Sequence, residues 1–501
     1  MQDIVQILCG WVFCIVILYL MYIKAVPSKQ GLPRSYPFAG HIFAMLKHRE
    51  AVLDWTADVL RKSPTSTFFL RFPFGRARIL TANPKNIQHI MKTRFKDYPK
   101  SRNFVDSFRD LFGASIFLAE GEIWKKHRML YGAELHSKSF HSFVDTITRQ
   151  ELSDRMFPLL SDASAADKIL NMQDLFSRFT FDVVGRIGLG HDFAYLSPSY
   201  PEMEFGDAFD EAMDITWKRS TSLFVTSWKV MKLLDVGSEW RLRRAVGVLR
   251  RLIGKLIRER KEFGDDFFSR LMSKNISDET FLIDAGIAII LGGVDTMVSG
   301  FTWLFWSIAR HPAVEEKILQ EIEDFDAGRT KDLAYTHATV AESLRLHPPV
   351  PLEGKQARED DVWPDGTRVQ KGMGIVCHTY AVGRSAEVWG PDWPEFKPER
   401  WLKKEGGGAG EPERWSFVAR DAFAYPVFQA GPRICLGKDI AFMQLKMVAV
   451  AVLRRFRVVD VAANGGGVPH CESYVSFRMA DGFPVRIVER SNFHKAGEAA
   501  A

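Results

Sequence analysis

The chain has 501 residues, and 46% of them are hydrophobic, so it can bury a large core and its composition is not that of a disordered protein. The formal net charge is only +6 and no long run of Lys and Arg occurs, which argues against nucleic acid as a partner. The five cysteines form no CxxC pair, which argues against a disulfide framework or a zinc site and suits a reducing compartment; they are Cys9, Cys14, Cys377, Cys435 and Cys471.

The first segment predicts a membrane anchor. Residues 4–23 carry no charge and are about as many as a helix needs to cross a bilayer. A cleaved signal peptide would begin with basic residues, whereas Asp3 precedes this run. Lys24 and Lys29 follow it, and positive charge on that side favours a cytosolic location for the rest of the chain. We therefore expect residues 1–23 to form a single transmembrane anchor.

The remainder of the chain predicts a hinge and one large domain. Pro33 and Pro37 stiffen residues 24–45, and residues 46–501 are expected to fold together. Apolar residues at three- and four-residue spacing predict helices at 178–190, 242–263 and 339–347. Strand-like runs are short, at 67–82 and 366–383, and a solvated loop is expected at 403–415. The pattern predicts a mainly α fold with small β-sheets.

Residues 281–309 predict a long apolar helix that is interrupted by the polar motif GGVDTM. Asp295 and Thr296 are costly inside such a helix, so their presence needs a functional reason. Gly292 and Gly293 weaken the helix just before Thr296, whose hydroxyl can bond back to a carbonyl and open a notch. The motif therefore indicates a local opening beside an acid.

The stretch FQAGPRICLGKDIAF places Cys435 just before another apolar helix. A lone cysteine can be an inert apolar residue, a nucleophile or a metal ligand. A helix N-terminus stabilises a thiolate, and Gly431 and Gly437 let the backbone approach a flat partner. Phe428 can shield the sulfur, and Arg433 can meet a carboxylate. A thiolate, a flat face and an anion-binding arginine together describe a haem iron bound by Cys435.

These residues, Phe428, Gly431, Arg433, Cys435 and Gly437, match FxxGxRxCxG and resemble the haem signature of the cytochromes P450. The likeness extends over nearly the whole chain and implies the cytochrome P450 fold, with haem b as the cofactor. It implies that the iron is bound by Cys435 and that NADPH supplies electrons through a reductase.

The resemblance assigns expected roles to further residues. Trp124 and Arg128, at i, i+4 spacing in EIWKKHR, are expected to hydrogen-bond a haem propionate. Glu342 and Arg345 of AESLR and Arg400 of FKPERW are expected to form a buried structural triad.

The GGVDTM motif resembles the oxygen-activation motif of the family, [AG]GxDT[TS]. In that role Asp295 relays protons and Thr296 supplies the essential hydroxyl. Met297 replaces the usual second hydroxyl residue, and Val294 stands where relatives carry a polar side chain. We expect oxygen chemistry to survive, with the two departures affecting coupling and substrate shape.

Residues 347–401 and 178–190 resemble plant cytochromes P450 that hydroxylate the terminal carbon of fatty acyl chains. Residues 111–124 depart from the GIFNxDG pattern of that group at Ser115, Leu118 and Glu120. The expected reaction is terminal hydroxylation, with or without further oxidation to aldehyde or acid, of a fatty acid or of a sterol side chain, such as C-26 of a cholesterol derivative. Residues expected near the substrate are Phe112, Phe117, Leu118, Val294 and Met297.

Two alternatives remain: a jasmonate-conjugate hydroxylase, or a haem protein of this fold that does not activate oxygen. The intact Asp295–Thr296 pair favours oxygen activation. The expected location is the endoplasmic reticulum membrane, with a single span and a cytosolic catalytic domain. The expected partners are an apolar small molecule, the membrane, and an NADPH-cytochrome reductase that docks on Lys438, Lys446, Lys125 and Lys126.

Overall fold

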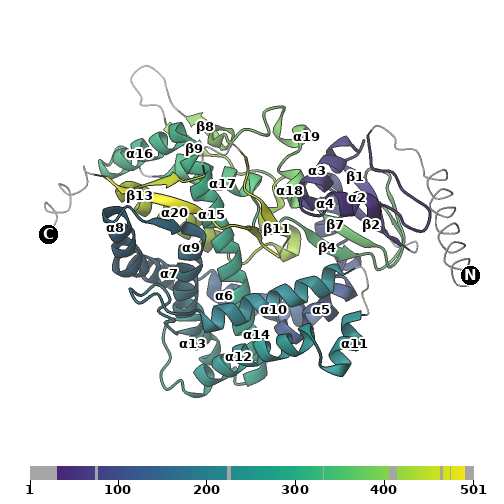
Figure 1. Ribbon diagram of the computed structural model, residues 1–501, viewed down its shortest axis with the longest axis horizontal. Helices are drawn as coiled ribbons and strands as arrows, with labels where there is room; N and C mark the ends of the chain where they lie inside the picture. The colour runs from purple at the N-terminus through teal and green to yellow at the C-terminus, as the bar shows by residue number, and fades with distance from the viewer. Residues whose placement is uncertain are drawn as a thin grey trace, which may run out of the picture. The chain divides into compact units, whose positions relative to one another are not determined.

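A computed structural model describes residues 31–73, 77–222, 227–330, 332–405, 414–462, 467–473 and 475–490 (Figure 1). The predicted anchor at residues 4–23 lies outside the described residues. The chain divides into two compact units. Of the described residues, unit 1 contains those in 31–101, 352–393 and 430–432, and unit 2 contains those in 102–351, 394–429 and 433–490.

Unit 1 is built around a four-stranded sheet in the order β1-β2-β7-β4. Its strands are β1 (Thr67–Arg71), β2 (Ala77–Thr81), β4 (Glu353–Gln356) and β7 (Gly374–Cys377). β2 pairs with β1 and β4 pairs with β7 in antiparallel fashion, whereas β2 and β7 are parallel. The other elements are α2 (Ile42–Lys47), α3 (Val52–Lys62), α4 (Pro84–Gln88), η2 (His89–Thr93), η3 (Phe95–Asp97), β5 (Asp361–Val362), β6 (Arg368–Val369), α18 (Thr379–Val382) and α19 (Ala386–Trp389).

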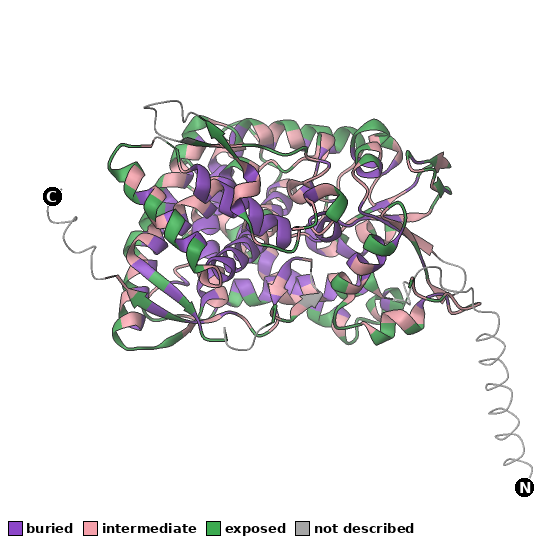
Figure 2. Cartoon of the chain, turned by 90° about the horizontal axis from the view of Figure 1, so that it is seen from above, coloured by how far each residue is buried: buried purple, intermediate pink, exposed green. Residues whose placement is uncertain are grey.

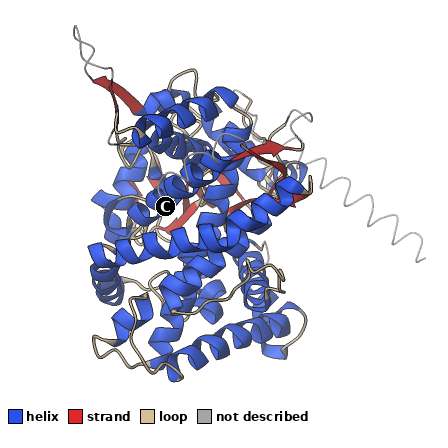
Figure 3. Cartoon of the chain, turned by 90° about the vertical axis from the view of Figure 1, so that its left-hand side faces the viewer, coloured by secondary structure: helices blue, strands red, loops and turns tan. Residues whose placement is uncertain are grey.

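Unit 2 consists mainly of helices, as the blue ribbons of Figure 3 show. The helices of its first half are α5 (Arg102–Phe112), α6 (Gly121–Leu135), α7 (Lys138–Glu151), α8 (Phe157–Ala165), α9 (Met172–Val184), α10 (Glu204–Thr221), α11 (Ser227–Leu234), α12 (Ser238–Arg258) and α13 (Phe267–Met272). The later ones are α14 (Glu279–Ile290), α15 (Thr296–Ala309), α16 (Pro312–Asp326), α17 (Ala334–Leu346) and α20 (Lys438–Arg455). Short helical turns are η4 (Leu152–Met156), η5 (Gly185–Leu189), η6 (Leu291–Asp295), η7 (Pro398–Trp401) and η8 (Pro426–Phe428), and η9 (Gly431–Arg433) begins in unit 1 and ends in unit 2.

The sheets of unit 2 are small and antiparallel. β10 (Phe456–Asp460) and β3 (Ile169–Asn171) flank β13 (Pro484–Glu489). Two hairpins complete the unit: β8 (Leu402–Glu405) with β9 (Arg414–Phe417), and β11 (Cys471–Ser473) with β12 (Phe477–Met479).

The core of unit 2 is the continuous helix of α14, η6 and α15. Glu279–Ala309 is the one helix among the described residues that is long and apolar enough to cross a membrane. Its most apolar window has a mean hydropathy of 1.9 and is 67% buried in protein, which is the pattern of a core helix. Figure 2 shows such buried helices with exposed residues on the outer faces of their neighbours.

The mainly helical prediction is confirmed, with local corrections. The helix predicted at 178–190 is confirmed by α9 and η5. The helix predicted at 242–263 ends earlier, at Arg258 of α12. The loop predicted at 403–415 is wrong at both ends, because β8 and β9 pair Lys403 with Ser416 and Lys404 with Trp415. The glycine-rich centre of that segment, residues 406–413, lies outside the described residues and concealed the hairpin signal of its flanks.

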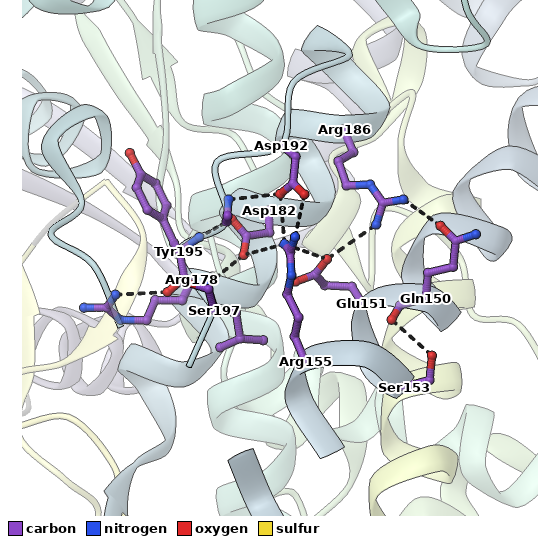
Figure 4. A network of polar contacts seen from close by, with 12 residues as sticks. Gln150, Glu151, Ser153, Arg155, Arg178, Asp182, Arg186, Asp192, Tyr195 and Ser197 are labelled. Atoms are coloured by element: carbon purple, nitrogen blue, oxygen red, sulfur yellow. Dashed lines mark hydrogen bonds and ion pairs between the residues drawn. The ribbon is translucent and has the colours of Figure 1, made fainter. Parts of the chain in front are cut away.

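An ionic network around the buried carboxylates of Glu151 and Asp182 ties α7 to α9 and to the loop after η5 (Figure 4). Arg155 contacts the carboxylates of Glu151 at 3.2 Å, Asp182 at 3.4 Å and Asp192 at 2.5 Å. The Glu151 side chain is only 1% exposed, and Arg186 approaches it at 3.5 Å. Burial, reinforced by the charge of Asp182, raises the pKa of Glu151 to about 7 despite the opposing effect of Arg155.

We predict that Glu151→Gln flattens the pH dependence of stability. A carboxyl whose folded pKa is raised contributes stability that is present below its unfolded pKa of 4.5 and is lost as pH rises through about 7. As pH rises from 4.5 to about 7, the free energy of unfolding measured in urea should therefore fall in wild type. This fall should be roughly 1–3 kcal/mol larger than in Glu151→Gln. Asp145→Asn, which removes a carboxylate from the exposed part of the same helix, is the control and should keep the wild-type slope. Equal slopes in wild type and Glu151→Gln would contradict the prediction.

Candidate active site

Cys435 lies just before α20, as the sequence predicts. Gly437 is the N-cap residue of that helix, and the Cys435 amide donates to the Phe428 carbonyl at 2.8 Å. This hydrogen bond joins the loop after η8 to the start of α20. The cysteine is therefore held by backbone contacts on a short, constrained loop.

The Cys435 side chain is exposed, yet burial raises the pKa of its thiol. The amide of Gly437 and the charge of Arg128 act in the opposite direction. Cys435 is thus accessible while protein atoms surround its sulfur. A Cβ added to Gly437 would meet the Cys435 sulfur at 3.9 Å, which is ordinary van der Waals contact, so space alone does not require glycine there.

Gly431 has a structural reason that differs from the one predicted. Its φ is +65°, and an added Cβ would lie 2.1 Å from the Met91 carbonyl oxygen, both within unit 1. A side chain there would clash with backbone, which cannot move aside as a side chain can. The contact with Met91 therefore suffices to require a glycine, whether or not a flat partner is bound.

Three of the predicted cofactor-binding residues gather around the Cys435 loop. Arg128 of α6 donates from Nη1 to the Ile434 carbonyl at 2.7 Å. The guanidinium of Arg433 lies 4.6 Å from the centroid of the Trp124 ring and donates to Glu120 Oε2 at 2.6 Å. The sequence revealed Glu120 only as a departure from a family pattern, and its ion pair with Arg433 was missed. Two guanidinium groups fit the propionate carboxylates of a haem, and an accessible sulfur fits its iron.

The notch predicted in the core helix is present. η6 is a π-helical turn between α14 and α15, and Thr296 Oγ1 donates to the Gly292 carbonyl at 2.8 Å. Gly292 is exposed and Thr296 is half-buried, although most of the surrounding helix is buried. A Cβ on Gly293 would lie 2.9 Å from Val184 of α9, so this glycine serves helix packing. The opening is therefore at Gly292 and Thr296.

Asp295 is buried beside the notch, with only 1% of its side chain exposed. Its Oδ1 accepts a hydrogen bond from Arg478 of β12, and within the described residues it makes none with Thr296. Burial raises the pKa of Asp295, whereas the positive charge of Arg478 lowers it. Sequence reasoning found the acid and missed Arg478, which is distant in the sequence and belongs to no shared motif.

Among the residues predicted near the substrate, Phe117 has the clearest position. The tip of its ring would lie 3.6 Å from a Cβ on Gly292, so it faces the notch. Phe117 continues a row of rings from α5, with centroid separations of 4.5 Å for Phe104–Phe108, 5.8 Å for Phe108–Phe112 and 6.1 Å for Phe112–Phe117. The other predicted residues are buried: Phe112, Leu118, Val294 and Met297.

The structure brings Glu342, Arg345 and Arg400 together. Arg345 donates from Nε and Nη2 to the two carboxylate oxygens of Glu342, both at 2.8 Å, and Arg400 Nε donates to Oε1 at 2.8 Å. The indole of Trp401 donates to Oε2 and the amide of Lys397 to Oε1, both at 2.9 Å. Glu342 and Arg345 are fully buried. The last two donors were not foreseen, although Trp401 directly follows Arg400.

The comparisons with known proteins agree with this geometry. The family model "Cytochrome P450" matches residues 31–465. Cytochrome P450 94A2 of Vicia sativa is 42% identical over 475 residues, 92% of this chain and 91% of that protein. Cytochrome P450 94B1 of Arabidopsis thaliana is 37% identical over 93% of each chain, and the alkane hydroxylase MAH1 of Arabidopsis thaliana is 31% identical over 96% of this chain and 98% of its own.

A mainly helical fold with an exposed cysteine just before α20 is what a haem-thiolate protein requires. The chain belongs to the cytochrome P450 family. It is accordingly a monooxygenase whose cofactor is haem and whose electrons come from a reductase.

We predict that Cys435→Ser and Cys435→His lose the absorption band of the reduced, CO-bound protein that is typical of thiolate ligation, because the sulfur ligand is gone. Reduced-minus-oxidised difference spectra under CO measure this directly. Cys471→Ser is the control and should keep the band, since Cys471 lies in hairpin β11–β12. An intact thiolate band in Cys435→Ser would show that another residue binds the iron.

Proposed function

We propose that this monooxygenase hydroxylates the terminal carbon of a long apolar substrate, with fatty acids first and sterol side chains second. The observation that carries the proposal is the approach of Phe117 to the notch at Gly292. The relative named as an alkane hydroxylase supports it, because an alkane offers only apolar surface for recognition.

Terminal selectivity has to come from positioning. Secondary C–H bonds are weaker than those of a methyl end and outnumber them, so free access would favour inner carbons. A narrow approach that admits the chain end-on prevents this by excluding inner carbons from the reacting position. The row of rings that ends at Phe117 is stiff, since each ring packs on the next, and therefore suits this task.

The chain's own residues have distinct roles in this proposal. Cys435 binds the haem iron, and Trp124, Arg128 and Arg433 hold the propionates, which sets the orientation of the cofactor. The haem, when bound, supplies the chemistry that activates O2. Thr296 keeps its hydroxyl in the notch by donating to Gly292, and Asp295 supplies protons from its carboxyl group.

Incubation with NADPH, a plant reductase and a panel of fatty acids, jasmonate conjugates and sterols, followed by mass spectrometry, tests the reaction. We expect mainly terminal hydroxylation of a fatty acid. Phe117→Ala should widen the approach and increase the share of inner-carbon products several-fold, because the chain can bend past the notch. Phe104→Ala, at the far end of the row of rings, should change this share less. Products oxidised only at inner carbons or on a ring would refute terminal hydroxylation.

A reductase docking surface is supported by a groove along α20. This groove has a volume of about 1010 Å³. Its lining includes the basic residues Lys438, Lys446, Arg149, Arg420 and Arg454 and the acidic residues Asp145, Asp326 and Asp439, which leaves an excess of positive charge. Gly292, Thr296 and Phe117 are not among its lining residues. Lys125 and Lys126 are exposed on α6 and do not line the groove. The docking surface therefore centres on α20.

Charge reversal tests that surface. Lys438→Glu should slow the first electron transfer from the reductase about tenfold at low salt, because the attraction that accelerates encounter is lost. Substrate affinity, measured from the spectral shift on binding, should stay constant. Lys255→Glu, on an exposed face of α12, is the control. A normal rate in Lys438→Glu, or equal slowing in the control, would reject this docking surface.

We also propose that the protein is located at the endoplasmic reticulum membrane. Apolar side chains are exposed from α11 to the start of α12, with Leu233 at 85% and Leu234 at 64%. Lys229 and Lys232 precede them on α11 and pair with Asp106 and Asp110. The exposed apolar side chains suit contact with lipid tails.

A further inference from the structure

Arg478 connects the buried acid of the notch to a carboxylate at the protein surface. Its Nη2 donates to Asp295 Oδ1, while Nη1 and Nη2 approach the two oxygens of Asp210 at 3.1 Å and 3.3 Å. Side-chain exposure rises along this chain, from 1% at Asp295 to 17% at Arg478 and 44% at Asp210. The three residues come from η6, β12 and α10, all within unit 2.

The charge state of Asp295 depends on this connection. Burial disfavours its carboxylate, and the negative charge of Asp210 adds to that effect, whereas Arg478 favours it. Oδ2 accepts no hydrogen bond of ordinary geometry within the described residues, although the Ser476 hydroxyl is near enough to favour the charged form. Arg478 is therefore the main partner that compensates a buried charge.

Other charged groups on the elements around Asp295 have partners of their own. Arg178 of α9 pairs with Asp174 at 3.1 Å, and Asp182 belongs to the network of Arg155. The charges of Asp210 and Arg178 act on Asp207 of α10. Among the described residues, Arg478, Asp210 and the Ser476 hydroxyl act on Asp295.

We propose that Arg478 is a positioning residue that holds Asp295 as a carboxylate. When Asp295 takes up a proton, the guanidinium of Arg478 turns onto Asp210, which is its second anchor. The inference rests on the proposed role of Asp295 as the proton donor of the notch.

The proton balance explains why two anchors are needed. A guanidinium keeps its proton in proteins, so Arg478 cannot pass a proton inward and has to move aside. A proton from bulk solvent, relayed by water, then binds Asp295 and converts the buried carboxylate into a neutral acid. Arg478 keeps a bidentate carboxylate partner in Asp210 during this step, so it is not left unpaired. When Asp295 gives up its proton, its charge returns and Arg478 pairs with it again.

The first test reads the protonation of Asp295 without turnover. Infrared difference spectra of the ferric protein, assigned by subtraction of Asp295→Asn, should show a carboxylate in wild type near pH 7. Arg478→Gln should show a protonated carboxylic acid instead, because the compensating charge is gone. Arg478→Lys, which keeps a positive charge, should restore most of the carboxylate. The CO spectrum verifies that each variant is folded and binds haem.

The second test reads coupling, with peroxide formed per NADPH as the measure. Asp210→Asn should raise this ratio several-fold, since Arg478 then stays on Asp295, and Asp210→Glu should return it toward the wild-type value. Asp214→Asn, one turn along α10 in an exposed pair with Lys218, is the matched control and should behave as wild type.

An Asp295 carboxylate that persists in Arg478→Gln, or wild-type coupling in Asp210→Asn, would overturn the inference. Failure of the proposed function has a different signature. Products at inner carbons, with the infrared and coupling results as expected, would refute terminal hydroxylation and leave the role of Arg478 intact.

Discussion

Unit 2 depends on one buried carboxylate. Glu342 has no exposed surface, and an isolated charge in such a place would be prohibitively costly. Its two oxygens are instead saturated by two arginines, an indole and a backbone amide. Removal of one partner from such a buried set costs about 3–5 kcal/mol, because the remaining charge stays desolvated. The arrangement joins α17 to η7. The hydroxyl of Tyr425, which directly precedes η8, donates a further hydrogen bond to the Ala341 carbonyl of α17 at 3.1 Å.

Asp295 is also a buried carboxylate that needs compensating partners, but its surroundings differ from those of Glu342. Glu342 accepts hydrogen bonds from four residues. Within the described residues, Asp295 accepts one hydrogen bond, from an arginine that a second carboxylate also binds. A saturated carboxylate stabilises structure. A carboxylate with a shared partner can change its protonation state at low cost, which is what proton delivery requires. The number of donors around each acid therefore separates the structural role from the chemical one.

Local pattern made much of this structure predictable, and long-range pairing made the rest unpredictable. The position of Cys435 before α20 and the back-bond of Thr296 follow from neighbouring residues in the sequence, and both are present. The pairs of Arg478 with Asp295 and of Arg433 with Glu120 join residues far apart in the chain, and no periodicity relates them. Gly431 shows a third case: glycine was expected, but its cause, the Met91 carbonyl, lies in another segment of the chain. The hairpin β8–β9 was hidden by the composition of the residues between its strands.

The π-helical turn η6 has a consequence for how the core helix can vary. One extra residue in a turn rotates everything after it by about 100° relative to an uninterrupted α-helix. The half before the turn, α14, packs on α5 and α12, and the half after it, α15, packs on α9, α17 and α20. The packing faces of the two halves are thus rotated relative to those of an uninterrupted α-helix. A single-residue deletion within Leu291–Asp295 would turn one packing face away from its neighbours. The remaining side chains would all be the same as before. Insertions and deletions, more than substitutions, are therefore the changes that this helix tolerates least.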